Sequence, residues 1–114
     1  MILPNAGNAF IDEKKLIDYC LSESHPIGKH KARVFISALG FSVENYQDLK
    51  NAILINIQNN EATITEINQY GALYVVDISA ENSPKNAIVR TSWIIKTDEN
   101  FPRLTRLTSC YVIL

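Results

Sequence analysis

Glycine is scarce in this sequence, and no two glycines lie close together. The 114 residues contain four glycines, at positions 7, 28, 40 and 71. Loops that cradle a phosphate with their backbone need two or more glycines within a few residues. The Gly-x-Ser-x-Gly elbow that presents a nucleophilic serine is also absent. The sequence therefore excludes both of these catalytic and nucleotide-binding motifs.

Histidine and cysteine are equally scarce, with two residues of each. His25 and His30 do not form a metal-ligand spacing with any cluster of Cys, Asp or Glu, so we expect neither a metal site nor a cofactor. Cys20 and Cys110 lie far apart in the sequence among apolar neighbours. We therefore expect two reduced, mostly buried thiols, as is usual in a cytoplasmic protein.

Long hydrophobic runs are missing as well. No apolar stretch approaches the roughly 20 residues that cross a bilayer, and the first 15 residues lack the basic start and apolar centre of a secretory signal. We therefore expect a cytoplasmic location and no membrane partner. The formal net charge of −1 argues against a non-specific nucleic-acid binder, because such proteins carry a large basic surplus. A local basic patch stays compatible with this charge.

The residues that are present favour one globular domain with a helical first half. A hydrophobic fraction of 46% in 114 residues is enough for a real core, so we expect a single domain over residues 1–114. Apolar residues recur with helical spacing after Asp12, over 29–39 and after Ser42, where Ser42 can cap the third helix. Gly40 is a suitable C-terminal stop for the second. The predicted helical region covers residues of about 12–59.

Beyond residue 60 the hydrophobic period changes from 3.6 to 2, and β-branched residues become frequent. This pattern predicts strands at about 62–69, 72–79, 87–96 and 104–113. The first two connections are short, so successive strands should pair as antiparallel hairpins. The predicted fold class is α+β, with N-terminal helices packed on one face of a four-stranded antiparallel β-sheet.

A first candidate site lies at the start of the second predicted helix. Four basic residues gather there without an intervening acid: Lys29, His30, Lys31 and Arg33. A helix N-terminus carries partial positive charge, which disfavours cations by about 0.3–1 kcal/mol each at exposed sites. A bound phosphate would remove this conflict. The alternative is a solvated helix start whose basic side chains point to water.

A second candidate lies in the strand predicted at 87–96. Arg90 is surrounded by apolar residues and needs a partner, which is either a carboxylate on a neighbouring strand, Asp77 or Glu66, or the phosphate of a ligand. Strand alternation places Thr91 on the opposite face from Arg90. Both side chains can serve one site only if a β-bulge lies between them.

A third candidate lies in the last predicted strand, where Ser109 and Tyr111 share one face. Two such hydroxyls can bind a phosphate or transfer a proton. The alternative is that Tyr111 packs its ring on the helices. The triplet Arg-Leu-Thr occurs twice just before them, at 103–105 and 106–108. We align 106–111 with the strand and expect a turn or bulge at 103–105.

Several motifs together resemble a known family. They are LPNAGNAFIDEKKLIDYCLSESHPIGKHKARVFISALGF at 3–41, YGALYVVDI at 70–78, VRTSWII at 89–95, and FPRLT followed by SCY at 101–111. They resemble a small family of bacterial proteins that forms a domain of unknown function, with the pattern LPN, HPxGxHKAxxFxxxLG, YGxxYxV, VRTxW and PRLxTxY. Similar domains end large polymorphic and contact-dependent-inhibition toxins, as RNases of the barnase/EndoU/colicin/RelE class.

The resemblance implies a metal-independent endoribonuclease-like toxin domain, in which the ribose 2′-hydroxyl attacks the adjacent phosphate. His30 would then be the acid or base, Lys31 and Arg90 would stabilise the phosphate, Thr91 and Ser109 would donate hydrogen bonds, and Tyr111 would act as a donor or stacking platform. Further phosphate contacts would come from Lys29, Arg33 and Arg106. The implied partners are a structured RNA and a cognate antitoxin or immunity protein.

A second hypothesis from another class is a non-catalytic binding module, such as the immunity, antitoxin or accessory subunit of a two-gene system. Such a protein would form a stable complex with the product of a neighbouring gene, and it would not depend on His30.

Overall fold

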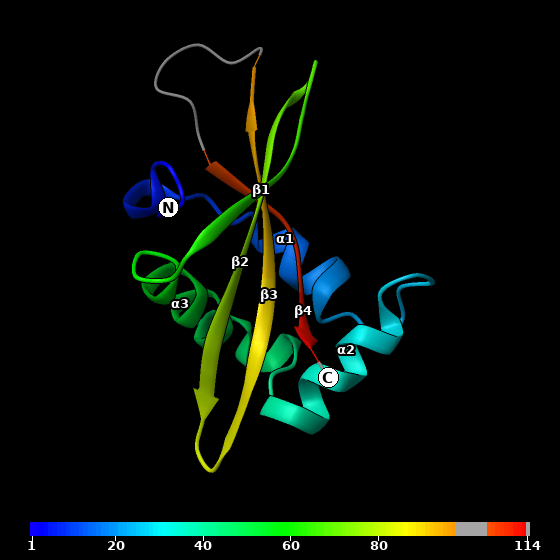
Figure 1. The fold of residues 1–114 in the computed structure, drawn as a ribbon. Coiled ribbons are helices and arrows are strands. Elements are labelled where there is room, and N and C mark those ends of the chain that lie inside the picture. The colour runs from blue at the N-terminus through cyan, green and yellow to red at the C-terminus, as the bar shows by residue number, and fades with distance from the viewer. Residues whose placement is uncertain (98–104, 114) are drawn as a thin grey trace.

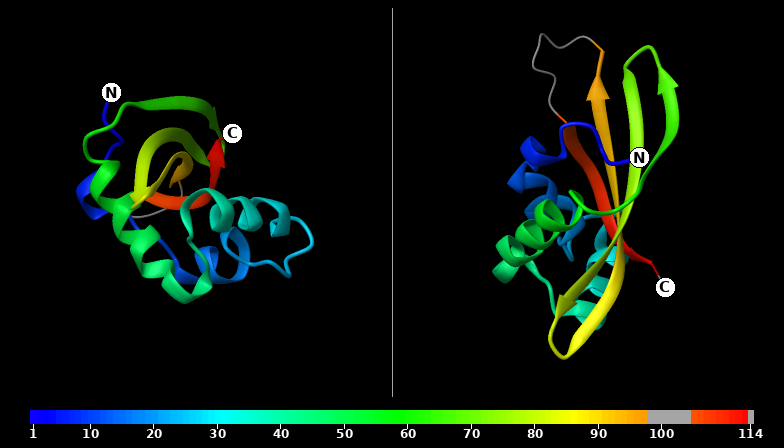
Figure 2. Two further views of the ribbon diagram at one scale, coloured as in Figure 1. Left: turned by 90° about the horizontal axis from the view of Figure 1, so that it is seen from below. Right: turned by 60° about the vertical axis from the view of Figure 1, so that its left-hand side comes forward.

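The computed structural model describes residues 1–97 and 105–113 and confirms the predicted fold class (Figure 1). Helices come first, and a four-stranded antiparallel sheet follows with its strands in chain order. The strands are β1 (Ala62–Asn68), β2 (Gly71–Asn82), β3 (Lys85–Lys96) and β4 (Thr105–Ile113). The long β2–β3 pair forms the centre of the sheet, which twists strongly (Figure 2).

The three predicted helical regions all form, although the first is irregular. A single α-turn, α1 (Glu13–Lys15), continues as a π-helical turn, η2 (Leu16–Cys20). The Asp12 carboxylate caps α1 by accepting a hydrogen bond from the Lys14 N–H at 3.0 Å. A short 3₁₀ turn, η1 (Ala6–Asn8), precedes this region. Within the described residues, no helix is both long enough and apolar enough to span a bilayer.

The second and third helices begin and end close to the predicted residues. Helix α2 (Lys29–Leu39) ends at Gly40, whose φ of 67° is the left-handed conformation that glycine adopts easily. Ser42 forms a capping box with Asn45 ahead of the 3₁₀ turn η3 (Val43–Asn45) and helix α3 (Tyr46–Asn56). The prediction for the third helix was therefore correct in its start and about one turn too long at its end.

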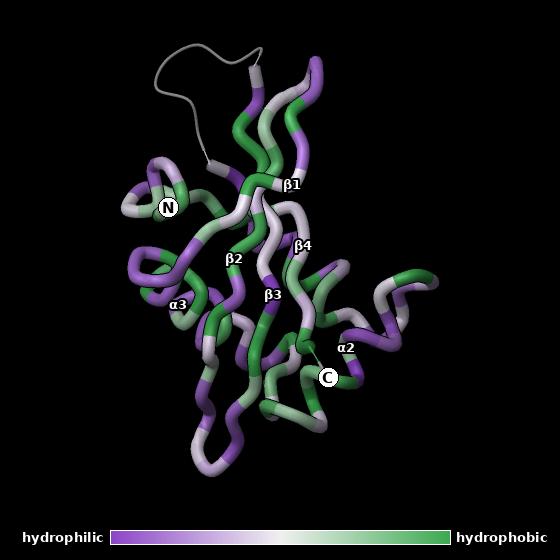
Figure 3. The backbone as a smooth tube through the Cα atoms, viewed as in Figure 1, coloured by the Kyte–Doolittle hydropathy of each residue, from purple (hydrophilic) through white to green (hydrophobic). Residues whose placement is uncertain are grey.

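The β2–β3 hairpin is longer than predicted. Residues 80–82 and 85–86, which we expected in a connection, instead continue the two strands, and residues 83–84 form the turn at a hydrophilic tip (Figure 3). The tip also contacts the C-terminal end of α2. The Asn82 amide donates a hydrogen bond to the Leu39 carbonyl at 2.7 Å, and Lys85 Nζ donates one to the Ser37 carbonyl at 3.1 Å. These bonds satisfy carbonyls that a helix end leaves without partners. The extension thus caps the second helix.

The hydrophobic core lies between the helices and one face of the sheet. Trp93 and Phe35 are its largest fully buried side chains, and the inward residues alternate along β2 and β3 as the period-2 pattern predicted. The two cysteine thiols are free and buried in this core. A hydrogen bond to Cys20, together with burial, raises the pKa of the Cys110 thiol well above its usual value. Cys110 is therefore unreactive in the folded state.

The N-terminal segment attaches to both edges of the sheet, which sequence reasoning did not anticipate. Phe10 N–H donates to the Thr105 carbonyl at 2.7 Å, and Leu107 N–H donates to the Phe10 carbonyl at 3.0 Å. At the opposite edge, Ala62 N–H donates to the Met1 carbonyl at 2.7 Å. These contacts provide hydrogen-bond partners for some of the backbone groups that the two edge strands would otherwise expose.

The structure corrects part of our interpretation of the repeated Arg-Leu-Thr triplet. Thr105, which we assigned to a turn or bulge, is a buried residue of β4, and its hydroxyl donates to the Pro4 carbonyl at 2.6 Å. The irregularity instead lies further along, because Ser92 pairs with Ser109 while Trp93 pairs with Leu107, leaving residue 108 as the extra one. The predicted strand residue 104 and the turn residue Arg103 lie outside the described residues.

Candidate functional site

A row of polar side chains crosses the sheet on the face opposite the core. Asp77 on β2 pairs with Arg90 on β3, and Arg90 pairs with Tyr111 on β4. Arg90 lies between the buried residues Val89 and Thr91 and therefore points away from the core. Lys31 from α2 extends the row beyond β4, because its Nζ lies 4.1 Å from the centre of the Tyr111 ring. We call Lys31, Tyr111, Arg90 and Asp77 the polar row.

The centre of the polar row is a two-point ion pair. Arg90 Nε donates to Asp77 Oδ1 at 2.9 Å, and Arg90 Nη2 donates to Asp77 Oδ2 at 3.0 Å. Asp77 first, and Tyr111 to a smaller extent, raise the pKa of the Arg90 guanidinium further above its already high value. Of the two carboxylates considered from the sequence, Asp77 is thus the partner, whereas Glu66 accepts a hydrogen bond from the Asn68 amide.

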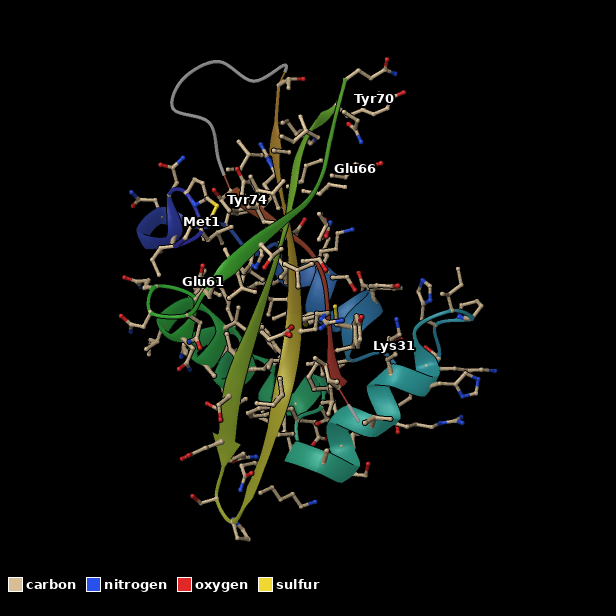
Figure 4. All side chains as sticks on the ribbon, in the orientation of Figure 1. Met1, Lys31, Glu61, Glu66, Tyr70 and Tyr74 are labelled. Atoms are coloured by element: carbon tan, nitrogen blue, oxygen red, sulfur yellow. The ribbon has the colours of Figure 1, made fainter. Side chains whose placement is uncertain are left out.

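Tyr111 contacts a cation from the helical layer. Its side chain is half-buried, and the Lys31 ammonium lies over the ring in a cation–π contact. Figure 4 shows Lys31 on α2, beside β4. Because Arg90 stands at the paired position on β3, the tyrosine lies between two cations. Of the two cations, Arg90 is already paired with Asp77, so Lys31 supplies the excess positive charge beside Tyr111.

Ser109 lies on the same face as Tyr111, as the sequence predicted, and it pairs with Ser92 on β3. Same-face neighbours along a strand are about 6.6 Å apart. Ser109 is half-buried, and its pair with Ser92 is the next same-face pair after Arg90–Tyr111, within reach of a ligand bound at the row. The two serines add hydroxyl groups beside the row.

The other basic residues of α2 do not join the polar row. His30 and Arg33 are exposed, Lys29 is half-buried, and within residues 1–97 and 105–113 none of their side chains forms a hydrogen bond or ion pair. Successive helical residues point about 100° apart, so His30 and Lys31 face in different directions. The N-terminal turn of α2 thus contributes one side chain, Lys31, to the row.

Thr91 lies on the core side and not beside Arg90. Its hydroxyl donates to the Val76 carbonyl at 2.7 Å and accepts from Trp93 Nε1 at 2.8 Å. The bulge that could bring Thr91 to the other face occurs in β4 and not in β3. Thr91 therefore completes the hydrogen bonding of a buried tryptophan, and we leave it out of the proposed site.

Arg106 lies apart from the row as well. It pairs with Ile94 on β3, and its guanidinium carbon lies 5.9 Å from the centre of the Phe10 ring. The contact places Arg106 against the N-terminal segment at the outer edge of β4.

Sequence reasoning missed a pocket at the β2 end of the polar row. Its volume is about 510 Å³, and it is lined by the Arg90–Asp77 pair together with Asn60, Glu61, Thr63, Thr65 and Val75. The alternating threonines of β1 are a sequence signal for this pocket. However, Thr63 lies opposite Val75 only in the strand register that the structure shows. We call this cavity the β1–β2 pocket.

His25, the other histidine, has a structural role. Its Nδ1 accepts hydrogen bonds from the N–H groups of Ile27 and Gly28, each at 3.0 Å. Gly28 permits the close approach of this loop, because a Cβ there would lie 2.7 Å from the Tyr19 carbonyl oxygen. In the part of the chain that the structure describes, no three His, Cys, Asp or Glu residues gather in a way that could hold a metal ion.

These features define an α+β domain whose antiparallel sheet packs on helices with one face and carries a charged row and a pocket on the other. The chain belongs to the family described as Domain of unknown function (DUF6883), whose model matches residues 2–113. No curated protein and no solved structure matches the chain. The match confirms membership of a family of unknown function, while the likeness to toxin RNases stays a proposal.

Proposed function

We propose that the polar row binds a phosphate of RNA and that the protein is a metal-independent endoribonuclease of the toxin type. The observation that carries this proposal is the position of Lys31, Tyr111 and Arg90. They come from three different elements, and they place the Tyr111 ring beside the Lys31 ammonium and opposite Arg90 on the neighbouring strand. Ser109 adds a hydroxyl donor next to the row.

The chemistry requires two proton transfers and charge stabilisation. The ribose 2′-oxygen forms a bond to phosphorus while the bond to the 5′-oxygen breaks, giving a 2′,3′-cyclic phosphate and a 5′-hydroxyl. Lys31 and Arg90 balance the added negative charge of the phosphorane. Tyr111 gives its proton to the departing 5′-oxygen, and a carboxylate or imidazole accepts the 2′-hydroxyl proton.

We assign the proton acceptor to Asp77 in preference to His30. A phosphate that binds Arg90 competes with Asp77 for the guanidinium N–H groups and thereby leaves a carboxylate oxygen for the 2′-hydroxyl. Asp77 belongs to the row, whereas the described structure connects His30 to none of its members.

The test of the proposal is RNA cleavage by the purified protein, together with growth of cells that express it. We expect cleaved RNA and arrested growth for the wild type, and a loss of about 100-fold in rate for Lys31→Ala, Arg90→Ala or Tyr111→Phe. Lys96→Ala is the matched control, since it removes one charge from the same strand about 20 Å from Arg90. Intact RNA with the wild-type protein, or equal losses in the control, would contradict the proposal.

A comparison of Asp77→Asn with His30→Ala tests the assignment of the proton acceptor. We expect Asp77→Asn to reduce cleavage by about 100-fold or more, because the amide cannot accept the proton. His30→Ala should retain most of the activity. The reverse order of effects would transfer the role to His30, and thermal unfolding of both variants shows whether either change acts through stability.

The alternative function, a non-catalytic binding module, is favoured by one observation. Asp77 already satisfies Arg90 with two hydrogen bonds, so the pair needs no ligand. Under this alternative, the purified protein leaves RNA intact and forms a stable complex with the product of an adjacent gene. The cleavage assay with purified protein separates the two functions directly.

A further inference from the structure

Strand β1 forms an edge of the sheet that is largely uncovered. Residues 63–68 are exposed, and β2 is their strand neighbour on one side. The N-terminal segment reaches only the start of the other side, where Ala62 N–H donates to the Met1 carbonyl. Within residues 1–97 and 105–113, no backbone hydrogen bond is made to the outer side of 63–68. Edge strands are commonly protected by lysine or proline, and this stretch contains neither.

Large apolar side chains are exposed along the same edge. In the part of the chain that the structure describes, ten large hydrophobic residues are exposed, and five of them lie on β1, in the turn after it or in the N-terminal segment beside it: Met1, Ile2, Ile64, Ile67 and Tyr70. Tyr70 stands at the end of the β1–β2 hairpin (Figure 4), which extends beyond the helices (Figure 2). Exposed apolar residues that gather in this way commonly mark an interaction surface.

The backbone of β1 directs unpaired hydrogen-bonding groups outward at two residues. The Ala62 N–H that binds the N-terminal segment points away from β2, and Ile64, two residues further along, has the same orientation. Ile64 pairs with Tyr74 and, after the β-bulge, Ile67 pairs with Ala72, so the two pairs have the same orientation as well. Ile64 and Ile67 therefore each offer an N–H and a C=O to a further strand, and their side chains share the core-side face.

Two copies of β1 are complementary when they run antiparallel about a two-fold axis between residues 65 and 66. Ile64 of one copy then lies opposite Ile67 of the other, and the outward N–H and C=O groups of each such pair bond to one another. The four isoleucine side chains meet on one face at the spacing of about 5 Å of cross-strand pairs. The two β-bulges face each other at the axis, so neither strand loses this register.

The ends of the paired strands bring further apolar residues together. In this register residue 68 of one copy lies opposite residue 63 of the other, and the turn that follows it reaches the N-terminal segment of the other copy. Tyr70 would then lie beside Met1 and Ile2, which are each about half-exposed in the single chain. Glu66, the one charged residue of 63–68, would lie opposite Thr65 and not opposite its own copy.

We propose that β1 is a dimer interface, through which two copies of this chain join their sheets into one sheet of eight strands. The occupant is a second copy because the exposed apolar residues and the outward backbone groups of β1 match each other under one two-fold axis. The interface is short, so we expect a reversible dimer. The polar row lies on β2, β3 and β4 and stays accessible, so this inference does not depend on the proposed function.

Sedimentation equilibrium of the purified protein, from about 1 μM to 1 mM, tests the inference. We expect the mean mass to rise toward that of a dimer as the concentration increases. Ile67→Lys should raise the dimer dissociation constant at least about tenfold, because it places a charge in the isoleucine cluster and a lysine on the edge. Ile88→Lys is the matched control, since Ile88 is also exposed but lies on β3. Circular dichroism shows that both variants fold.

Glu66→Gln distinguishes this register from unspecific association of apolar surfaces. The two Glu66 carboxylates lie near the two-fold axis and repel each other, since like charges on neighbouring strands are destabilising. We therefore expect Glu66→Gln to tighten the dimer by about twofold or more. Association through apolar surfaces elsewhere would not respond to this change.

Disulfide cross-linking measures the register itself. In the double variant Thr63→Cys/Asn68→Cys, the new thiols of the two copies face each other at a Cα separation of about 4.5 Å, which a disulfide can bridge. Oxidised glutathione takes up the two electrons and two protons that the thiols release. Thr63→Cys alone is the control, because its two copies lie five residues apart, about 17 Å. Cys20 and Cys110 are buried and do not compete.

Each outcome decides the proposal. A dimer that Ile67→Lys weakens and Ile88→Lys does not, together with cross-links only in the double cysteine variant, would support it. A monomer at every concentration would overturn it, including the case in which the monomer binds a different protein. A dimer that Ile67→Lys leaves unchanged, or a cross-link formed by Thr63→Cys alone, would also overturn the β1 interface.

Discussion

Replacing Trp93 with alanine should lower the free energy of unfolding by about 3–5 kcal/mol, the usual cost of removing a large buried aromatic side chain. Trp93 is fully buried at the centre of the sheet, between β2 and β4. The substitution leaves a cavity that the helices cannot fill without moving. Since small domains are typically stable by 5–15 kcal/mol, a substantial part of the stability would be lost.

Urea unfolding followed by far-ultraviolet circular dichroism measures this effect. Fluorescence is unsuitable, because Trp93 is the only tryptophan. Trp93→Phe is the matched control, because it keeps an aromatic ring and removes the hydrogen bond from Nε1 to the Thr91 hydroxyl. A cost below about 1 kcal/mol for Trp93→Ala would mean that this part of the core is not packed as the structure shows.

A double-mutant cycle isolates the hydrogen bond itself. Thr91→Val and Trp93→Phe each remove one partner of the same buried bond, so their costs should not add. Thr91→Val also leaves the Val76 carbonyl without the threonine donor. We expect the single changes to cost about 1–3 kcal/mol each and the double variant to cost less than their sum.

Much of the fold could be predicted because it depends on local pattern. The alternation of apolar residues places Val89, Thr91 and Trp93 on one face, and the structure buries all three. Antiparallel pairing then makes Asp77 a plausible partner of Arg90, since the two residues stand at equal distances from the turn that joins β2 to β3. The sequence limited the partner of Arg90 to Asp77 or Glu66, and the register of the β2–β3 hairpin in the structure selects Asp77.

The remaining features depend on contacts that no spacing in the sequence encodes. The approach of Lys31 to Tyr111 depends on how α2 packs beside β4, and this tertiary packing has no local pattern in the sequence. The bulges, after Ile64 in β1 and beside Leu107 in β4, each shift the register by one residue, and alternation alone does not locate them. The β1–β2 pocket depends on the first of these bulges and therefore stayed hidden.

If the polar row cleaves RNA as proposed, exchanging the two charges at its centre should abolish this cleavage while keeping the ion pair. In the double variant Asp77→Arg/Arg90→Asp, the guanidinium moves one strand, about 4.8 Å, away from Tyr111 and Lys31. The carboxylate then stands beside the tyrosine, where the phosphate should bind. Electrostatic stabilisation and proton transfer are lost together, and each typically contributes 100-fold or more, so we expect at least a thousandfold loss in rate.

This variant distinguishes a functional row from a structural ion pair. The Arg90 and Asp77 side chains are both about 40% exposed, so the exchanged pair should form in the same place with little change in thermal unfolding. If the pair only stabilises the sheet, then Arg90→Ala and Asp77→Ala should each affect the protein more than the exchange does. If the row binds phosphate, the exchange must be at least as harmful to cleavage as either single change. Retained cleavage in a stably folded double variant would therefore exclude the polar row from the proposed active site.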